Sequence, residues 1–392
     1  MLNIYVLNQD LQKIGIVDNY TSLIWAKRYI DFGDCEIYAP ATPENLEIFQ
    51  LDNYVIREDD DMVCRIESVE LDTNIETGNY LIITGTDCRK ILNQRIVWKQ
   101  TSFTGTAENF IRRLINQNII SPEDVDRAIP RFVLGEYYGF DERVSIQTSY
   151  DPIGDKIAEV CRMYGYGFKV TFDGNNFVFD IYKGSDRSFS QSENPRVVFS
   201  DDFENLKSSK FLMDKSAFKS VALVGGSGEG KDRYLTMVNT SIATGINRHE
   251  VFVDAKSISK NLTYEDLTEA YAGGTISTVS GTVYYSIGGE RIATLDDASD
   301  PKNAVLLDAP YYALLEEAGQ EELADAKTLS TFEGEVEAEN TYSYKTDYYL
   351  GDIVQIKNEF DIERAARIVE VVESYSEEGY SLIPTFEYAR EV

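Results

Sequence analysis

The segment of this chain that most resembles a site for chemistry is a glycine-rich loop. The apolar run of residues 221–224 is followed by Gly225-Gly226-Ser227-Gly228-Glu229-Gly230-Lys231. This spacing nearly matches G-x-x-x-x-G-K-[ST], the loop whose backbone N–H groups hold the phosphates of a nucleotide. A functional match would make the chain a nucleotide-dependent enzyme.

Three features of the same segment argue against nucleotide binding. Asp232 stands where the motif needs a hydroxyl for Mg²⁺, and Glu229 adds a second negative charge that would repel phosphate. A phosphate loop also opens a helix, whereas residues 233–238 alternate polar and apolar, as a strand does. We therefore interpret the glycines as a structural turn between strands that needs positive φ angles. These glycines are Gly225, Gly226, Gly228 and Gly230.

Two clusters of carboxylates are the next candidates, because Ca²⁺ takes oxygen ligands. The clusters are Asp59-Asp60-Asp61 and the acids between residues 296 and 300. Neither has the D-x-D-x-D-G spacing of a calcium loop, so we interpret both as solvated turns. A carboxylate pair suited to glycoside hydrolysis stays open, because among 67 acidic residues some must meet in space.

Nucleophilic catalysis and metal binding have little support. His249 is the only histidine and lies in a polar segment typical of a surface, and the chain has no G-x-S-x-G elbow. The four cysteines, Cys35, Cys64, Cys88 and Cys161, form no C-x-x-C pair and have apolar neighbours. We expect buried free thiols in a chain made in a reducing cytosol. We expect no metal site, no cofactor and no enzymatic activity.

The composition indicates a folded, acidic chain. Its 392 residues suffice for several domains, and 12% are aromatic, which is unlike a disordered chain. The net charge of −30 predicts a surface that repels nucleic acid and anionic lipid. No apolar run approaches the roughly 20 residues of a membrane span, and residues 1–10 do not resemble a signal peptide. We therefore expect a soluble chain, synthesised in the cytosol.

The first half of the chain passes from a β pattern to an α/β pattern. Residues 1–98 contain short runs rich in Val, Ile and Tyr that are separated by turns, as in strands. Thr106 can cap a helix whose apolar residues repeat with helical spacing. Asp151 and Pro152 open a second helix, which ends at Gly165, and a β-hairpin follows.

The second half is also mixed. Residues 197–199 and 220–224 have the composition of strands. Residues 264–271 and 309–326 are predicted to be helical, and the β pattern returns from residue 332 to the end.

An internal echo links the two β-rich ends of the chain. Arg65-Ile66-Glu67-Ser68-Val69-Glu70 precedes a turn at Gly78, and Arg367-Ile368-Val369-Glu370-Val371-Val372 precedes a turn at Gly379. Each block also follows a short strand-like run and an acidic loop. β-Hairpins of similar composition can produce one such echo by chance. The shared order of strand, loop, strand, turn and strand favours a duplication.

Several segments together resemble a known family. They are DNYTSLIW at residues 18–25, IYKGSDR at 181–187, VVFS at 197–200 with FENL at 203–206, KSVALVGG at 219–226, and DYYLGDIV at 347–354 followed by Arg367-Ile368. In order and spacing they resemble the siphophage tail hub family, which is related to the baseplate hub and to the N-terminal hub part of tail-associated lysins. The resemblance covers essentially the whole chain.

The resemblance implies an α+β, mainly β fold with two tail-tube-like β-barrels and two inserted α/β regions. The expected division is residues 1–98 for the first barrel, 99–196 for an α/β domain, 197–245 with 335–392 for the second barrel, and 246–334 for the inserted α/β domain. It also implies a structural homotrimer. Three chains with two barrels each would form a pseudo-six-fold ring at the distal end of a phage or phage-like tail.

The resemblance further implies partners and a location. The partners are the distal tail protein or tail tube above the ring, the tip, fibre or receptor-binding protein below it, and the tape measure protein. The location is the virion, after synthesis in the host bacterial cytoplasm. Specific nucleic acid binding is not expected. Many relatives carry an enzymatic or carbohydrate-binding extension, and we expect none here because the chain stops after the second barrel pattern.

A ring that passes DNA would favour an acidic wall, because Lys and Arg would hold phosphates. We therefore take acidic residues from both repeats as candidate pore-lining residues, although solvated turns explain any one of them equally well. They are Asp59, Asp60, Asp61, Asp72, Glu76, Glu359, Asp361, Glu363, Glu377 and Glu378. A rival function is a cell-wall carbohydrate-binding or hydrolysing tip module, for which Trp25 and Trp98 are the available tryptophans.

Overall fold

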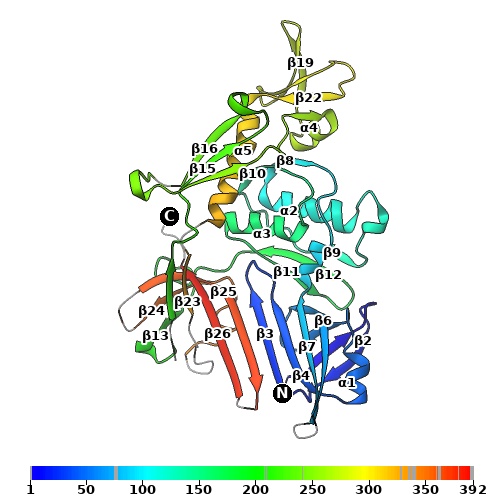
Figure 1. The fold of residues 1–392 in the computed structure, drawn as a ribbon, viewed down its shortest axis with the longest axis vertical. Coiled ribbons are helices and arrows are strands. Elements are labelled where there is room, and N and C mark those ends of the chain that lie inside the picture. The colour runs from blue at the N-terminus through cyan, green and yellow to red at the C-terminus, as the bar shows by residue number, and fades with distance from the viewer. Residues whose placement is uncertain are drawn as a thin grey trace.

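The computed structural model describes residues 2–74, 78–206, 208, 210–240, 242–326, 329–333, 336, 341–358, 360, 363–377 and 379–388. The molecule is elongated and has three tiers (Figure 1). A broad sheet forms one end, a helical α/β tier lies in the middle, and a smaller α/β unit forms the other end. The fold is mainly β, as the sequence predicted.

The broad sheet has thirteen strands and combines the two β-rich parts of the chain. The first part supplies β1 (Ile4–Leu7), β2 (Lys13–Val17), β3 (Ser22–Arg28), β4 (Asp34–Pro40), β5 (Tyr54–Arg57), β6 (Val63–Asn74) and β7 (Gly78–Asp87), with the short helix α1 (Pro43–Ile48). The later part supplies β13 (Val198–Ser200), β14 (Lys210–Asp214), β23 (Leu329–Glu333), β24 (Ile353–Lys357), β25 (Glu363–Ser376) and β26 (Gly379–Tyr388). The main order is β14-β23-β26-β25-β3-β4-β7-β6-β5-β1-β2, while β24 pairs with β25 and β13 with β24.

Alternation of apolar and polar residues explains what these strands bury. Along β4, Cys35 and Ile37 point into a core, while Glu36 lies on the opposite face. Two cores lie against the sheet. The first surrounds Trp25 under the N-terminal strands, and the second surrounds Phe199 under the C-terminal strands.

The two expected barrels are not closed in the single chain. β25 pairs with β3, so the two halves form one continuous sheet. The end strands of this sheet, β14 and β2, do not pair with one another within the described ranges. No closed barrel is found among the described strands, so the expected two tail-tube-like β-barrels are not confirmed by the isolated chain.

The internal echo is a repeat in three dimensions. β5–β6–β7 and β24–β25–β26 are both antiparallel, and each long hairpin has a bulge directly after the shared Arg-Ile, at Ile66 and at Ile368. Asp52 (φ 69°) and Gly351 (φ 96°) occupy matching positions with positive φ. Their N–H groups donate to the carbonyls of Ile66 (3.0 Å) and Ile368 (2.8 Å), respectively. The matching bulges and hydrogen bonds support the predicted duplication.

The repeat extends to two four-stranded sheets. The first is β3-β4-β7-β6 and the second is β14-β23-β26-β25, and every neighbouring pair in both is antiparallel. The second sheet meets the first where β25 pairs with β3. We call these the first and second repeat sheets.

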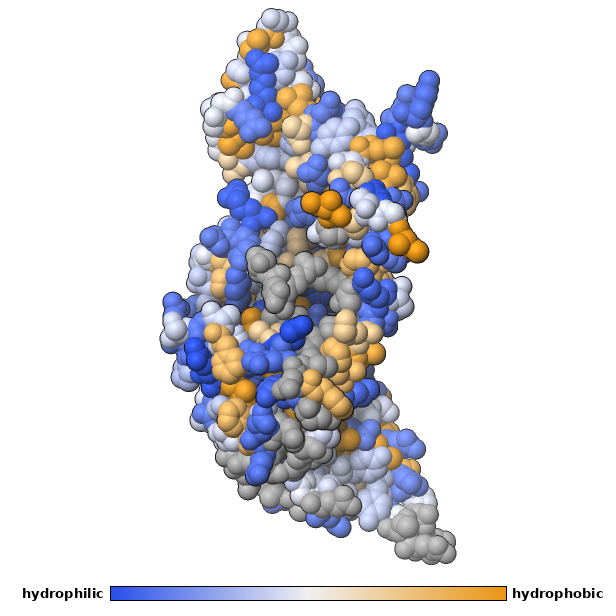
Figure 2. Space-filling view, turned by 90° about the vertical axis from the view of Figure 1, so that its left-hand side faces the viewer, coloured by the Kyte–Doolittle hydropathy of each residue, from blue (hydrophilic) through white to orange (hydrophobic). Residues whose placement is uncertain are grey.

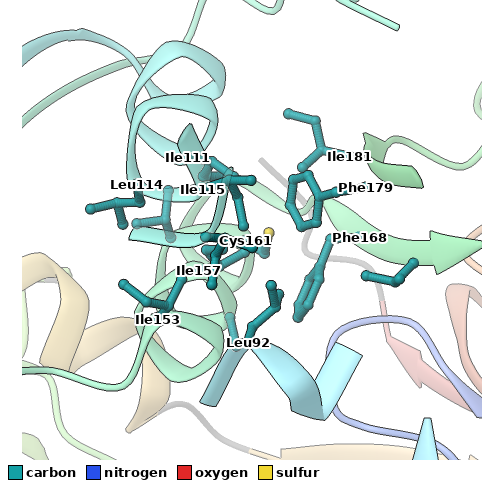
Figure 3. Packing of buried hydrophobic residues seen from close by; sticks show 14 of the residues in the cluster. Leu92, Ile111, Leu114, Ile115, Ile153, Ile157, Cys161, Phe168, Phe179 and Ile181 are labelled. Carbon is teal, nitrogen blue, oxygen red and sulfur yellow. The ribbon is translucent and has the colours of Figure 1, made fainter. Parts of the chain in front are cut away.

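The middle tier is built around two helices. Its elements are β8 (Thr101–Thr106), α2 (Ala107–Ile115), β9 (Phe132–Leu134), β10 (Arg143–Thr148), α3 (Ile153–Tyr164), β11 (Gly167–Phe172) and β12 (Phe177–Tyr182), with short helical turns at Cys88–Gln94, Asn116–Ile120 and Val125–Arg127. Ile111 and Ile115 of α2 face Ile157 of α3, with Phe168 and Phe179 of the β11–β12 hairpin beside them (Figure 3).

Both helices of the middle tier begin or end as the sequence predicted. The Thr106 hydroxyl accepts a hydrogen bond from Asn109 N (3.4 Å) at the start of α2. Gly165 ends α3 in the left-handed conformation (φ 68°). α3 begins directly after Pro152, but Asp151 does not cap it, because its carboxylate accepts a hydrogen bond from the hydroxyl of Thr148 instead.

The third unit contains two small sheets and two helices. β15 (Val221–Gly225), β16 (Leu235–Asn239) and β17 (Glu250–Asp254) form one sheet, and β18 (Asn261–Thr263), β19 (Thr275–Val279), β20 (Thr282–Ile287), β21 (Glu290–Leu295) and β22 (Asn303–Leu306) form the other. The helices are α4 (Tyr264–Ala270) and α5 (Asp308–Asp325). β15 and β16, which we expected in the second barrel domain of residues 197–245, join β17 and pack on α5 instead of joining the broad sheet.

Candidate functional site

The glycine-rich loop between β15 and β16 is filled by its own chain. Ser227 N donates to the Tyr311 hydroxyl (2.8 Å), which donates to the carbonyl of Ile258 (3.1 Å). The guanidinium of Arg233 donates to the carbonyls of Gly225 (2.7 Å) and Gly226 (2.9 Å). The bond to Tyr311 ties the loop to α5, and Gly226 N donates to the carbonyl of Tyr234 (2.8 Å). Two of the backbone N–H groups that a phosphate loop would offer to its ligand are therefore occupied.

The glycines of this loop serve a turn. Gly228 and Gly230 have positive φ angles of 96° and 56°, a conformation that other residues rarely adopt. A Cβ on Gly226 would lie 2.5 Å from the Tyr311 hydroxyl, so the loop lies directly against α5. After a 3₁₀ turn at Gly230–Asp232, the chain enters β16, which is antiparallel to β15. The predicted pair of strands is confirmed, and the geometry is that of a structural connection.

The acidic turn after β5 lies at the centre of a buried ionic cluster. The side chain of Asp60 is fully buried and pairs with Lys27 (2.9 Å) and Lys345 (2.7 Å). Arg57, also fully buried, pairs with Glu373 (2.6 Å) and lies 3.5 Å from Asp60. We call these five residues the ionic cluster.

Two neighbouring aspartates extend the ionic cluster toward the surface. Asp59 pairs with Arg57 (2.5 Å), and Asp61 pairs with Lys27 (2.7 Å) and with Lys169 of β11 (2.8 Å). The pairs therefore connect β3, β5, β11, β25 and the segment that precedes β24. The cluster joins the two halves of the broad sheet to the middle tier.

The charges of the ionic cluster keep one another ionised. Burial alone would raise the pKa of Asp60, but Lys27, Lys345 and Arg57 lower it to about 2. Burial alone would lower the pKa of Lys27, but Asp60 raises it well above its usual value. The side chain of Asp60 has no exposed surface, so the prediction of a solvated turn is wrong for this residue. A buried side chain also cannot face a pore.

A hollow of about 680 Å³ adjoins the ionic cluster, between the broad sheet and the β11–β12 hairpin. Its walls carry charges of both signs, and three of its cations, Lys27, Lys169 and Lys345, already pair with aspartates. In the part of the chain that the structure describes, no group of His, Cys, Asp and Glu is arranged to hold a metal ion. The hollow therefore resembles a joint between tiers more than a catalytic site.

The other candidate pore residues lie in different surroundings. Asp72 is exposed near the tip of β6, and Glu377 is exposed at the turn between β25 and β26. Glu363 is half-buried and accepts a hydrogen bond from Gln355 Nε2 (3.1 Å). The remaining four, Glu76, Glu359, Asp361 and Glu378, lie outside the described residues.

Two open strand edges are a feature that sequence reasoning did not locate. β6 pairs with β5 only through residues 63–65, so the same edge of residues 68–73 has no partner among the described strands. β14 pairs only with β23 in the described chain. Both edges carry exposed apolar side chains, with Leu71 51% exposed on β6 and Met213 67% exposed on β14. Apolar residues in strand-like runs look the same in sequence whether they are buried or exposed.

The remaining candidates have structural positions. Trp25 is buried, while Trp98 is exposed with the Arg127 guanidinium 4.7 Å from its ring, so one of the two proposed sugar-stacking tryptophans is inaccessible. His249 is exposed, and all four cysteines are buried, as predicted.

One face of the molecule is hydrophilic along most of its length, with scattered apolar residues (Figure 2). No helix in the described ranges is both long and apolar enough to cross a membrane.

Comparison with protein families agrees with the segments that first suggested a tail protein. The model of the Siphovirus ReqiPepy6 Gp37-like protein family matches residues 3–386. The chain belongs to this family. The resemblance to siphophage tail proteins is therefore confirmed.

Solved structures show that the fold is shared with phage tail proteins. The tail protein from Neisseria meningitidis MC58 has a TM-score of 0.54 at 11% identity over 98% of this chain and 96% of that one. The 43 kDa tail protein of prophage MuSo2 from Shewanella oneidensis has a TM-score of 0.54 at 10% identity over 98% of both chains. Prophage tail protein gp18 from Listeria monocytogenes EGD-e has a TM-score of 0.53 at 11% identity over 100% and 95%. No curated protein matches the chain in sequence.

Proposed function

We propose that this family member is a structural hub of a phage or phage-like tail, and that three copies form a pseudo-six-fold ring at its distal end. One observation carries the proposal. The chain already contains one junction between repeat sheets, β25 against β3, and leaves the matching edges of β6 and β14 open. Pairing β6 of one copy with β14 of the next would repeat the same junction between chains.

The internal junction fixes the register that this pairing would have. Two rows of cross-strand partners define matching positions in the repeat sheets. The row in the first sheet is Ile66–Gly85–Cys35–Trp25. The row in the second sheet is Ile368–Phe386–Phe332–Phe211. Trp25 of β3 thus corresponds to Phe211 of β14, and the bulges align β6 with β25.

Carrying the internal register over to two copies brings compatible side chains together. Within the chain, Val371 lies opposite Lys27. The matching positions between copies are Val69 and Met213, which are both apolar. One step of two residues along β6 places Leu71 opposite Phe211, and the next position places Asp72 opposite Lys210. Apolar and oppositely charged cross-strand pairs both stabilise a sheet, so the pairing would cover the exposed apolar residues of both edges.

Repetition of this junction produces a closed ring when the rotation between copies divides a full turn evenly, as we propose for three copies. Three copies, each with two repeat sheets, would place six similar sheets around one axis. A ring of this kind lets a three-fold tip sit on a six-fold tube. It also covers the open edges of β6 and β14, which otherwise promote uncontrolled association.

The partners follow from this position in the tail. The distal tail protein or tail tube would bind one side of the ring, and the tip, fibre or receptor-binding protein would bind the other. The tape measure protein is a further candidate for the ring centre. No reaction is assigned to the chain, because its motif for nucleotide chemistry is a turn and the hollow beside the ionic cluster is an ion-paired joint. The virion is the expected location.

The mass of the purified protein in solution, measured by light scattering together with electron micrographs, tests the proposal. We expect three times the chain mass of 44.4 kDa and images of rings. A protein that stays monomeric at high concentration, in conditions in which tails assemble, would contradict it.

A further inference from the structure

The outer edge of β2 is a second place where the broad sheet ends, and the ring does not use it. β2 is the last strand in the order and pairs with β1 alone among the described strands. Its backbone groups on the outer side are therefore available to a further strand. The proposed ring junction uses β6 and β14, at other positions of the sheet.

The two faces of β2 differ in character because side chains alternate along a strand. On one face, Val17 is buried, and a Cβ on Gly15 would lie 2.7 Å from Ile48 of α1. On the other face, Ile14 is 41% exposed and Ile16 is 56% exposed. A strand added at this edge would have α1 on one side and the two isoleucines on the other.

The α1 side of this edge is acidic. A hollow of about 610 Å³ lies beside β2 and is lined by β2 and α1. Asp18, Glu44 and Glu47 contribute carboxylates to its wall and are exposed. None of the three pairs with a cation of the described chain. The surface thus offers uncompensated negative charge on one side of an open edge and apolar surface on the other.

We propose that β2 accepts an extended segment of a partner protein as an added strand. The segment alternates Lys or Arg with β-branched apolar residues. Its backbone bonds to the free edge of β2, its cations lie over Glu44 and Glu47, and its apolar residues pack beside Ile14 and Ile16. Charge complementarity selects this partner over a second copy, because the chain as a whole is strongly acidic, with a net charge of −30.

The proposal is tested with a fluorescent peptide, Lys-Val-Lys-Val-Lys-Val-Lys-Val, blocked at both ends, and with the same peptide carrying Glu in place of Lys. We expect the assembled protein to bind the Lys peptide at least about tenfold more tightly than the Glu peptide. The double variant Glu44→Lys/Glu47→Lys should reverse this preference. The double variant Glu229→Lys/Glu290→Lys, which changes the charge equally in the third unit, should bind like the original protein.

Further controls distinguish strand addition at β2 from a general attraction of the Lys peptide to an acidic protein. A Lys peptide N-methylated at alternate residues should lose binding, because it cannot form the backbone ladder. The proposal is overturned if the original protein does not bind the Lys peptide, or if reversing charge at Glu229 and Glu290 acts like reversing it at Glu44 and Glu47. It is also overturned if Ile16→Lys lowers the mass of the assembly, because β2 would then contact a second copy.

Discussion

Asp60 connects three cations that come from distant parts of the chain. Lys27 lies on β3, Arg57 on β5 and Lys345 in the segment before β24. Without this carboxylate, the cations would face one another in a largely buried region, where an unpaired charge is more costly than on the surface. A change at this single residue therefore acts on the joint between the two halves of the sheet.

We expect Asp60→Asn to lower the free energy of unfolding by about 3 kcal/mol, because removing one partner of a buried pair leaves its counterpart uncompensated. Asp59→Asn is the matched control. The side chain of Asp59 is 35% exposed, so its loss should cost below about 1 kcal/mol. Chemical denaturation of both variants measures the difference. Equal stabilities would show that the cluster does not hold the joint.

The loop glycines should differ in their tolerance to substitution. We expect Gly226→Val to destabilise the third unit by about 2 kcal/mol, because the new side chain would collide with Tyr311 and Leu315. Gly230→Val should cost only about 1 kcal/mol, because its surroundings are open and only its positive φ is strained. Thermal denaturation measures the stability of both variants, and we expect Gly226→Val to melt at the lower temperature.

Nucleotide binding by the same loop can be tested directly. ATP with Mg²⁺ should not change the melting temperature of the original protein or of Lys231→Ala, because Lys231 lies in a turn that already uses its backbone groups. A nucleotide-dependent increase that Lys231→Ala abolishes would restore the phosphate-loop interpretation.

The contact between α3 and α5 should weaken as pH rises. Burial, with a smaller contribution from the charge of Glu321, raises the pKa of Glu317 to about 7, although the hydrogen bond from the Tyr164 hydroxyl acts to lower it. Since the folded pKa exceeds the unfolded one, the folded state holds the proton more tightly. The contribution of the protonated Glu317 to stability is complete at pH values below the unfolded pKa. It falls as the pH rises from that value to about 7, and it is absent above about pH 7.

We therefore expect Glu317→Gln to stabilise the protein by about 2 kcal/mol above neutral pH and to have no effect in mild acid. Glu316→Gln, at the exposed neighbouring position, is the control and should show no such pH dependence. Melting curves across this pH range provide the measurement. A constant difference between the original protein and Glu317→Gln would show that Glu317 has an ordinary pKa.

At the scale of elements, local signals were predictable and long-range pairing was not. Thr106 at the start of α2 and Gly165 at the end of α3 act within one turn of chain, so residue type and spacing reveal them. The β25–β3 junction brings Glu370 to Arg28 across 342 positions, and alternation along a strand does not say which strand lies beside it. For the same reason, the sequence did not show that β15 and β16 pair in a sheet with β17. It also did not show that three cations from distant parts of the chain surround Asp60.

The proposed ring junction gives a register-specific prediction. A chain carrying Val69→Cys and Met213→Cys should form disulfides between copies under mild oxidation, and denaturing gels should show linked trimers. Directly opposite cross-strand residues have Cβ atoms about 4.5–5.5 Å apart, close to the spacing that a disulfide requires. The native cysteines are buried and should not compete.

The matched control moves one cysteine by a single position, as Glu70→Cys with Met213→Cys. Neighbouring residues in a strand point to opposite faces, so this pair should remain unlinked. If both pairs link equally, or neither links although the mass is that of a trimer, the subunits meet through other strands. The measured mass therefore tests the trimer, and the disulfides separately test the proposed pairing of β6 with β14.

At the scale of the whole molecule, the ring would present one face of the repeat sheets to its centre. The opposite face is covered by the chain itself, because β1, β2 and the residues after α1 pack over Trp25 and Ile37. The face left open carries Glu36 of β4, and Glu70 and Asp72 of β6. Asp72 therefore remains a proposed pore residue, while the buried Asp60 does not.

A lumen lined in this way should repel DNA, because like charges in a narrow channel act strongly on one another. We expect rings of the original protein not to bind a short DNA duplex even at low salt. Rings of Glu36→Lys/Glu70→Lys should bind it, with a logarithmic salt dependence of about −0.9 for each phosphate contact. Rings of Glu229→Lys/Glu290→Lys carry the same change in charge on the third unit and should bind more weakly. Fluorescence anisotropy measures DNA binding by the original protein and by the two double variants, on rings whose mass has first been verified.

If the two double variants bind DNA equally, the acidic residues act through total charge alone, and the open face of the repeat sheets does not line the channel.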